Sequence, residues 1–132
     1  MEGVADAVVL LGDPVGGAVL YDMLLPYSGR LGFAHGTPAR PVDHWLGRLA
    51  TLLGRHDEAE RHFGVAVELC ERLRSPFYLA RALLGSADLC VARAAPGDLE
   101  RARTFAERAR AVAREFGLAA LEVRADAMLG AA

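Results

Sequence analysis

The stretch that decides the fold runs from residue 44 to residue 73 and reads HWLGRLATLLGRHDEAERHFGVAVELCERL. In its second half, apolar residues recur at steps of four, three, four and three, which is the spacing of an apolar stripe along one side of a helix. These residues are Ala59, Phe63, Ala66, Cys70 and Leu73. The first half is apolar on two sides, as is typical of a helix that packs against neighbours on both. Gly54 separates the halves, and since glycine readily takes the left-handed conformation that ends a helix, the stretch predicts two antiparallel helices.

Two details refine this predicted hairpin. Asp57 and Glu60 have the spacing of a capping box, in which each side chain accepts a hydrogen bond from an amide of the first turn. This pair predicts that the second helix starts at Asp57. Gly47 lies in the first helix and carries no side chain, so we expect the two helix axes to approach closely there.

The glycine that ends the first helix belongs to a repeat. From Gly12 to Gly54 is 42 residues, and from Gly54 to Gly97 is 43 residues. A small residue follows five positions after each: Gly17, Ala59 and Ala102. Each unit is one helical hairpin that cannot bury its apolar face alone, so neighbouring hairpins are expected to stack.

The helix boundaries follow from capping signals. Asp13-Pro14 and Ser75-Pro76 each place a capping side chain before a first-turn proline, and Asp98 is expected to cap a further helix that Gly117 ends. We therefore predict one domain over residues 1–132. Its parts are hairpins at about 4–27, 42–73 and 77–116, a final helix at 118–129, and an irregular loop at 28–40 that is rich in glycine and proline.

The helix after Asp98 has one apolar stripe and one charged face. The stripe consists of Leu99, Ala102, Ala106, Ala109, Ala113 and Phe116. We expect all six to face inward and the arginines and glutamates between them to face water, with ion pairs three residues apart along the helix.

Leu46, Gly47, Gly54, Ala59, Phe63 and Ala66 fall at the offsets of a tetratricopeptide hairpin, and the chain resembles that family. The resemblance implies an all-α fold of antiparallel helical hairpins stacked as a short right-handed solenoid. It also implies a scaffold that binds a protein or peptide partner. The segments LYDMLLPYSGR, LGRLATLLGRHDEAERHF and LARALLGSADLCVARAAPGDLERAR look like the C-terminal repeats of bacterial LuxR-type regulators and signalling ATPases.

Composition limits what the chain can do by itself. The formal net charge is −2, whereas a nucleic-acid-binding domain is expected to carry a basic surplus. All 15 basic residues are arginine, so the Gly-Lys-Ser or Gly-Lys-Thr of a phosphate-binding loop cannot occur. If the parent protein binds ATP or DNA, this piece does neither. We expect a cytoplasmic fragment of a larger protein with no membrane span, because Asp6, Asp13 and Asp22 interrupt the longest apolar region.

No cofactor, metal or catalytic group is expected. Cys70 and Cys90 stand apart in apolar stripes and are interpreted as buried thiols. His44, His56 and His62 lack the spacing of three or four residues that a helical metal site needs, so we interpret them as surface histidines. A metal or acid-base site assembled by tertiary packing is the alternative.

A ligand-sensing groove is a second hypothesis. The first helix of each stacked hairpin lines the concave surface, and its predicted solvent-facing residues are His44, Arg48, Thr51, Tyr78, Arg81 and Asp88. Arg48 and Arg81 could together bind a carboxylate or an acidic peptide through paired N–H donors, or could simply be solvated. Trp45 is expected in the core, with a ligand platform as the alternative.

Self-association is a third hypothesis. A short stack leaves an apolar surface at each end, and exposed apolar patches usually bind a partner. A homodimer through residues 1–27 or 118–129 would cover one. We therefore expect a non-catalytic interaction module, with a sensing groove or a homodimerisation module as alternatives.

Overall fold

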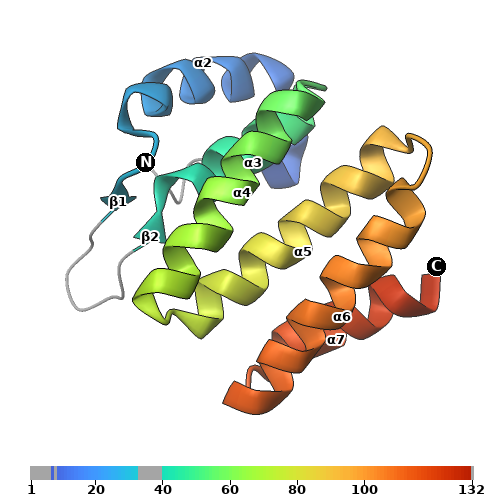
Figure 1. Cartoon of the computed structure of the whole chain (residues 1–132). Helices are drawn as coiled ribbons and strands as arrows, with labels where there is room; N and C mark the ends of the chain where they lie inside the picture. Colours follow the sequence, from blue (N-terminus) through green and yellow to red (C-terminus); the bar gives the residue numbers. More distant parts are fainter. Residues whose placement is uncertain (1–6, 8, 33–39, 132) are drawn as a thin grey trace. The chain divides into compact units, whose positions relative to one another are not determined.

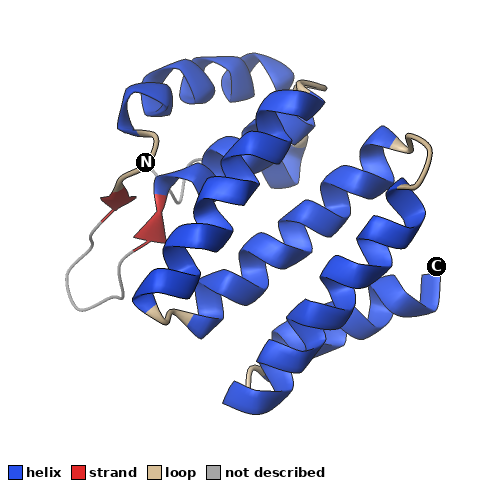
Figure 2. Cartoon of the chain, viewed as in Figure 1, coloured by secondary structure: helices blue, strands red, loops and turns tan. Residues whose placement is uncertain are grey.

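The computed structural model describes residues 7, 9–32 and 40–131, and nearly all of them are helical (Figures 1 and 2). In chain order the elements are α2 (Pro14–Leu24), a short 3-10 helix (Leu25–Tyr27), β1 (Leu31–Gly32), β2 (Arg40–Pro41), α3 (Val42–Leu52), α4 (His56–Leu73), α5 (Pro76–Arg93), α6 (Asp98–Phe116) and α7 (Ala119–Ala131). The predicted all-α fold of helical hairpins is confirmed. The chain divides inside α4 into two compact units, residues 1–66 (unit 1) and 67–132 (unit 2), which are described separately.

Unit 1 contains the hairpin predicted from the opening stretch. Gly54 lies in the turn between α3 and α4 with a φ angle of +74°, the left-handed conformation expected of it. A Cβ atom on Gly47 would lie 2.8 Å from the Phe63 ring, so the absence of a side chain is what allows α3 and α4 to pack this closely. Trp45 is buried and belongs to the core.

The start of α4 differs from the prediction. The helix begins at His56, and the amide of Ala59 donates to the carbonyl of Arg55 at 2.9 Å. Asp57 is therefore inside the first turn and is not the capping residue, so the predicted start is wrong by one residue. Its carboxylate still lies where the unpaired amides of a helix start favour negative charge. The predicted capping residue is also wrong at α6, where Gly97 holds the capping position and Asp98 is the first helical residue.

Helix α2 of unit 1 is shorter than expected. Asp13 caps α2 as predicted, with its Oδ1 accepting from the amides of Val15 and Gly16 at 3.1 and 3.2 Å. The α-helix stops at Leu24 and continues only as the 3-10 turn. At the start of the predicted hairpin 4–27, residues 7 and 9–11 are helical, whereas residues 4–6 and 8 lie outside the described part of the chain.

The predicted loop at 28–40 is not wholly irregular. β1 and β2 form a two-residue antiparallel ladder, in which Leu31 lies opposite Pro41 and Gly32 opposite Arg40. The ladder leads directly into α3. Residues 33–39, which form the middle of the predicted loop, are outside the described part of the chain.

Unit 2 is built around small apolar side chains. Helices α5, α6 and α7 pack together (Figure 1), and a core cluster joins Ala80, Leu83, Leu84, Ala109, Ala113, Leu121 and Ala125. Cys70 and Cys90 are buried thiols, as expected, and burial raises the pKa of Cys70 to about 12.

The ends of the predicted α6 stripe are exposed. Ala102, Ala106, Ala109 and Ala113 are buried, but Leu99 and Phe116 are 65% and 54% exposed, so the prediction that both face inward is wrong. At about 100° per residue, Leu99 and Phe116 lie at opposite edges of the stripe, about 100° apart. Only the alanines between these edges face α5 and α7.

The charged face of α6 connects helices of unit 2. Arg108 pairs with Glu71 at the end of α4 at 3.1 Å, and Arg114 pairs with Glu122 of α7 at 2.8 Å. Arg110 lies 3.4 Å from Asp126 of α7. These three pairs join neighbouring elements. A fourth pair, between Arg101 and Asp98 at 3.4 Å, has the expected separation of three residues along the helix.

Candidate functional site

A buried polar cluster links three segments of unit 1. The imidazole of His62, on α4, lies 2.8 Å through Nδ1 from the Asp43 carboxylate of α3. Its other nitrogen, Nε2, lies 2.9 Å from the hydroxyl of Tyr21, on α2. The same hydroxyl lies 2.9 Å from Oε2 of Glu58, one turn before His62. Asp43, His62 and Tyr21 are all buried.

Asp43 is the centre of this cluster. Besides His62, it accepts hydrogen bonds from the Ser28 hydroxyl at 2.7 Å and from the amide of Gly29. Burial alone would raise the pKa of Asp43, but these hydrogen bonds outweigh burial and hold that pKa below its ordinary value. One ionised carboxylate therefore fixes the turn after α2 and the hairpin of α3 and α4.

The Tyr21 hydroxyl connects two polar side chains of α4. Its oxygen lies 2.9 Å both from Oε2 of Glu58, to which it donates, and from Nε2 of His62. A hydroxyl has one proton to donate and two lone pairs that accept, so Tyr21 can serve both neighbours at once.

The surroundings of Tyr21 keep its hydroxyl protonated. Burial and the neighbouring Glu58 raise the pKa of Tyr21 to about 12. The Arg55 guanidinium lies 5.1 Å from the centre of the Tyr21 ring, where a cation is attracted to the face of the aromatic system. The cluster thus joins helices of unit 1, and its central side chains offer no open surface to a ligand.

The interpretation of His44 and His62 as surface residues is wrong, because both are buried. His44 packs edge-on against the rings of Trp45 and Phe63, with centroid distances of 5.0 and 6.2 Å. A signal for His62 existed in the sequence: it lies three residues after Ala59 and four before Ala66, which places it on the apolar stripe of α4.

The six predicted groove residues divide between the two units. His44 of α3 and Tyr78 of α5 are buried, so the prediction that they face solvent is wrong. Thr51 is half-buried and its hydroxyl donates to the carbonyl of Gly47 at 2.8 Å. Arg48 is also half-buried.

Of the remaining two groove residues, Arg81 stacks near the rings of Phe77 and Tyr78 at 5.7 and 5.8 Å. Asp88 is exposed and lies 3.7 Å from Arg124 of α7. The joint binding of one carboxylate by Arg48 and Arg81 involves both units and stays a prediction.

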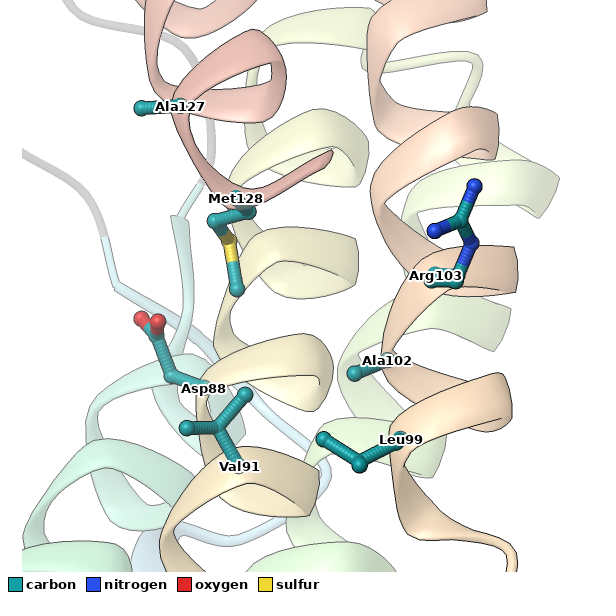
Figure 3. Close-up of a pocket in the computed structure, with 7 residues that line it drawn as sticks. All are labelled: Asp88, Val91, Leu99, Ala102, Arg103, Ala127 and Met128. Carbon is teal, nitrogen blue, oxygen red and sulfur yellow. The ribbon is translucent and has the colours of Figure 1, made fainter. Parts of the chain in front are cut away.

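Asp88 also lines a pocket in unit 2 (Figure 3). The pocket has a volume of about 340 Å³ and is formed by Asp88 and Val91 of α5, Leu99, Ala102 and Arg103 of α6, and Ala127 and Met128 of α7. Figure 3 shows Val91, Leu99 and Met128 gathered around Ala102, with Asp88 on the α5 side and Arg103 on the α6 side. The sequence analysis named only Asp88 as a ligand-binding residue, and Ala127 and Met128 fall within the segment 118–129 that it considered for self-association.

Neither a metal site nor a membrane-spanning helix is present among the described residues. No group of three or more His, Cys, Asp or Glu side chains at 7, 9–32 and 40–131 is arranged to hold a metal ion. No helix in the same part of the chain combines the length and the apolar character needed to cross a bilayer.

Paired helices, left-handed glycine turns and small residues at the helix contacts define a helical-repeat protein. Residues 40–115 match the model of the tetratricopeptide repeat, a match that spans more than half of the sequence and runs from β2 through most of α6. The chain belongs to the tetratricopeptide repeat family. No curated protein and no solved structure matches it.

Proposed function

We propose that this chain is a non-catalytic interaction module that recognises a protein or peptide partner. Its membership of the tetratricopeptide repeat family carries the proposal, because such repeats generally mediate protein-protein interaction. Two half-buried arginines support it, because the guanidinium groups of Arg48 on α3 and Arg81 on α5 are of the kind that pairs with acidic peptides.

The proposed setting is a bacterial cytoplasmic signalling or transcription-regulating ATPase, of which this chain would form the C-terminal repeats. The resemblance of its segments to the repeats of LuxR-type regulators supports this setting. A gene that encodes no nucleotide-binding domain upstream of these residues would contradict it.

Selection from a displayed library of random short peptides tests the proposal. We expect enriched peptides whose synthetic versions bind the full chain in a saturable way, and we expect the double variant Arg48→Glu and Arg81→Glu to lose the acidic ones. A library that yields no saturable binder would contradict the interaction function. If the acidic peptides bind the double variant as well as wild type, Arg48 and Arg81 are not part of the binding surface, and the interaction function itself still stands.

The outer side of α2 favours self-association as a second candidate function. Val15, Val19 and Met23 recur every four residues along that side and are 75%, 55% and 51% exposed. Large apolar side chains in a row are typical of a helix that packs against another. Light scattering tests this candidate: a dimer that Val19→Glu converts to monomer supports it, and a monomer at high protein concentration contradicts it.

A further inference from the structure

The pocket between α5, α6 and α7 has the features of a binding site. Ligand pockets are concave and mostly apolar, have volumes of roughly 300 to 1,000 Å³, and contain a few polar groups that orient the ligand. This pocket has a volume of about 340 Å³ and combines five apolar side chains with one acidic and one basic side chain. Its size suits one large side chain with its adjoining backbone.

The floor of the pocket is preformed and its walls are exposed. Ala102 forms the floor and belongs to a buried cluster with Ala87 and Cys90. On either side, Leu99 and Val91 are 65% and 54% exposed. Met128 is partly buried and packs against the same cluster. Its unbranched thioether side chain can adjust to different apolar groups. A ligand side chain would thus remove from water two large apolar groups that the chain itself leaves uncovered.

The charges at the rim select the chemistry of the ligand. Asp88 already has a cation nearby, since Arg124 lies 3.7 Å away. Arg103 makes no ion pair with any residue in the described part of the chain. The guanidinium that remains available therefore favours a carboxylate next to the apolar group.

From this geometry we infer that the pocket binds a peptide segment in which a large apolar residue is followed by an acidic residue. The apolar side chain lies over Ala102 between Val91 and Leu99, and the carboxylate pairs with Arg103. The inference rests on the proposed interaction function, because that function makes a peptide the ligand.

Nuclear magnetic resonance titration of the full chain with blocked tetrapeptides tests the inference. The probe is acetyl-Gly-Leu-Glu-Gly-amide, compared with versions carrying Lys for Glu or Ala for Leu. We expect shifts at the amides of Val91, Leu99, Ala102 and Met128, and at least about tenfold weaker binding of the Ala peptide, since most of the buried apolar area is lost. The Lys peptide is expected to bind about two- to fivefold more weakly, the range of an exposed ion pair.

Matched variants locate the effect. Arg103→Gln is expected to remove the preference for Glu over Lys, and Leu99→Asp to abolish binding. Arg72→Gln, which neutralises an exposed arginine at the end of α4, should change neither. A preference for Glu that survives in Arg103→Gln, or equal binding of the Leu and Ala peptides, would overturn the inference.

The outcomes separate this inference from the broader function. Saturable peptide binding with shifts outside the pocket overturns the pocket assignment and leaves the interaction module standing. No binding of these peptides, together with a displayed library that yields no binder, overturns both.

Discussion

Among the described residues, each unit contains one buried aspartate, and the two are used differently. Asp43 of unit 1 accepts from His62, Ser28 and Gly29, which lie 19, 15 and 14 residues away in the sequence. Asp98 of unit 2 accepts from Arg93 and the amide of Ala95, five and three residues away. A polar cluster thus joins distant segments in unit 1, whereas in unit 2 it secures one turn and the alanine core joins the helices. Unit 1 should be sensitive to loss of polar groups, and unit 2 to changes of side-chain size.

The largest effect is expected from Asp43→Ala. It removes the acceptor of a buried cluster and leaves the donors of His62, Ser28 and Gly29 without their partner. Each buried donor left without its acceptor in this way costs about 1 to 3 kcal/mol of the free energy of unfolding. Urea unfolding of the full chain, with hydrogen exchange of individual amides to locate the loss, measures it.

Two aspartate variants serve as comparisons. Asp22→Ala, at an exposed position of α2, should change the free energy of unfolding by less than about 0.5 kcal/mol. Asp98→Ala should be less damaging than Asp43→Ala, because its partners are local. Hydrogen bonds from Arg93 lower the pKa of Asp98 to about 2, so its contribution exists above the unfolded pKa and is lost as pH falls towards 2. Equal losses at both aspartates would remove the distinction between the units.

Ala113→Leu tests the importance of size in unit 2. Ala113 is fully buried in the cluster with Leu83 and Leu121, so the added carbons force neighbouring side chains to move. Overpacking of this kind costs about 1 to 3 kcal/mol. Thermal unfolding followed by circular dichroism measures it against Ala111→Leu, an exposed position on the same helix where no loss is expected.

Tyr21→Phe removes only a hydroxyl from the unit 1 cluster. The lost hydrogen bonds to Glu58 and His62 should cost about 1 to 2 kcal/mol at neutral pH. Because the folded pKa of Tyr21 is raised to about 12, folding favours the protonated phenol. Its stabilisation is complete below the unfolded value of about 10 and disappears as pH rises from there to about 12.

Alkaline unfolding experiments check this pH dependence. Wild type should lose stability between about pH 10 and 12 more steeply than Tyr21→Phe, and parallel curves would contradict the assignment.

The smallest effect is expected from Arg108→Ala. Its pair with Glu71 is half exposed on both sides, and exposed pairs contribute between zero and about 1 kcal/mol. Added salt should reduce even this difference, since it screens the interaction. A loss as large as that of Ala113→Leu, measured in the same way, would show that surface charge helps to hold unit 2 together.

The sequence allowed the helices to be predicted more reliably than the contacts. The apolar stripe from Ala59 to Leu73 and the turn at Gly54 defined the central hairpin, because both are local patterns with a fixed period. The β1–β2 ladder was missed since two residues per strand show no alternation. The start of α4 was predicted one residue too late because Asp57 was interpreted as the capping residue of the helix.

The candidate sites were less predictable because they join residues that are distant in the sequence. His62 could have been recognised as buried from its place on the α4 stripe, but its separation of 41 residues from Tyr21 leaves no pattern in one sequence. The pocket depends on where three helices converge around Ala102. Asp88 was expected on a binding surface, whereas Leu99 was assigned to the core because it shares the spacing of the alanines.

The contact between Gly47 and Phe63 has a consequence for how the family can diverge at these two positions. A Cβ atom added at Gly47 would lie 2.8 Å from the Phe63 ring, so a larger residue at position 47 requires the ring to move or to be replaced by a smaller side chain. Relatives that carry alanine or serine in place of the glycine should carry a smaller residue in place of the phenylalanine. The two positions are therefore expected to covary as a compensating pair.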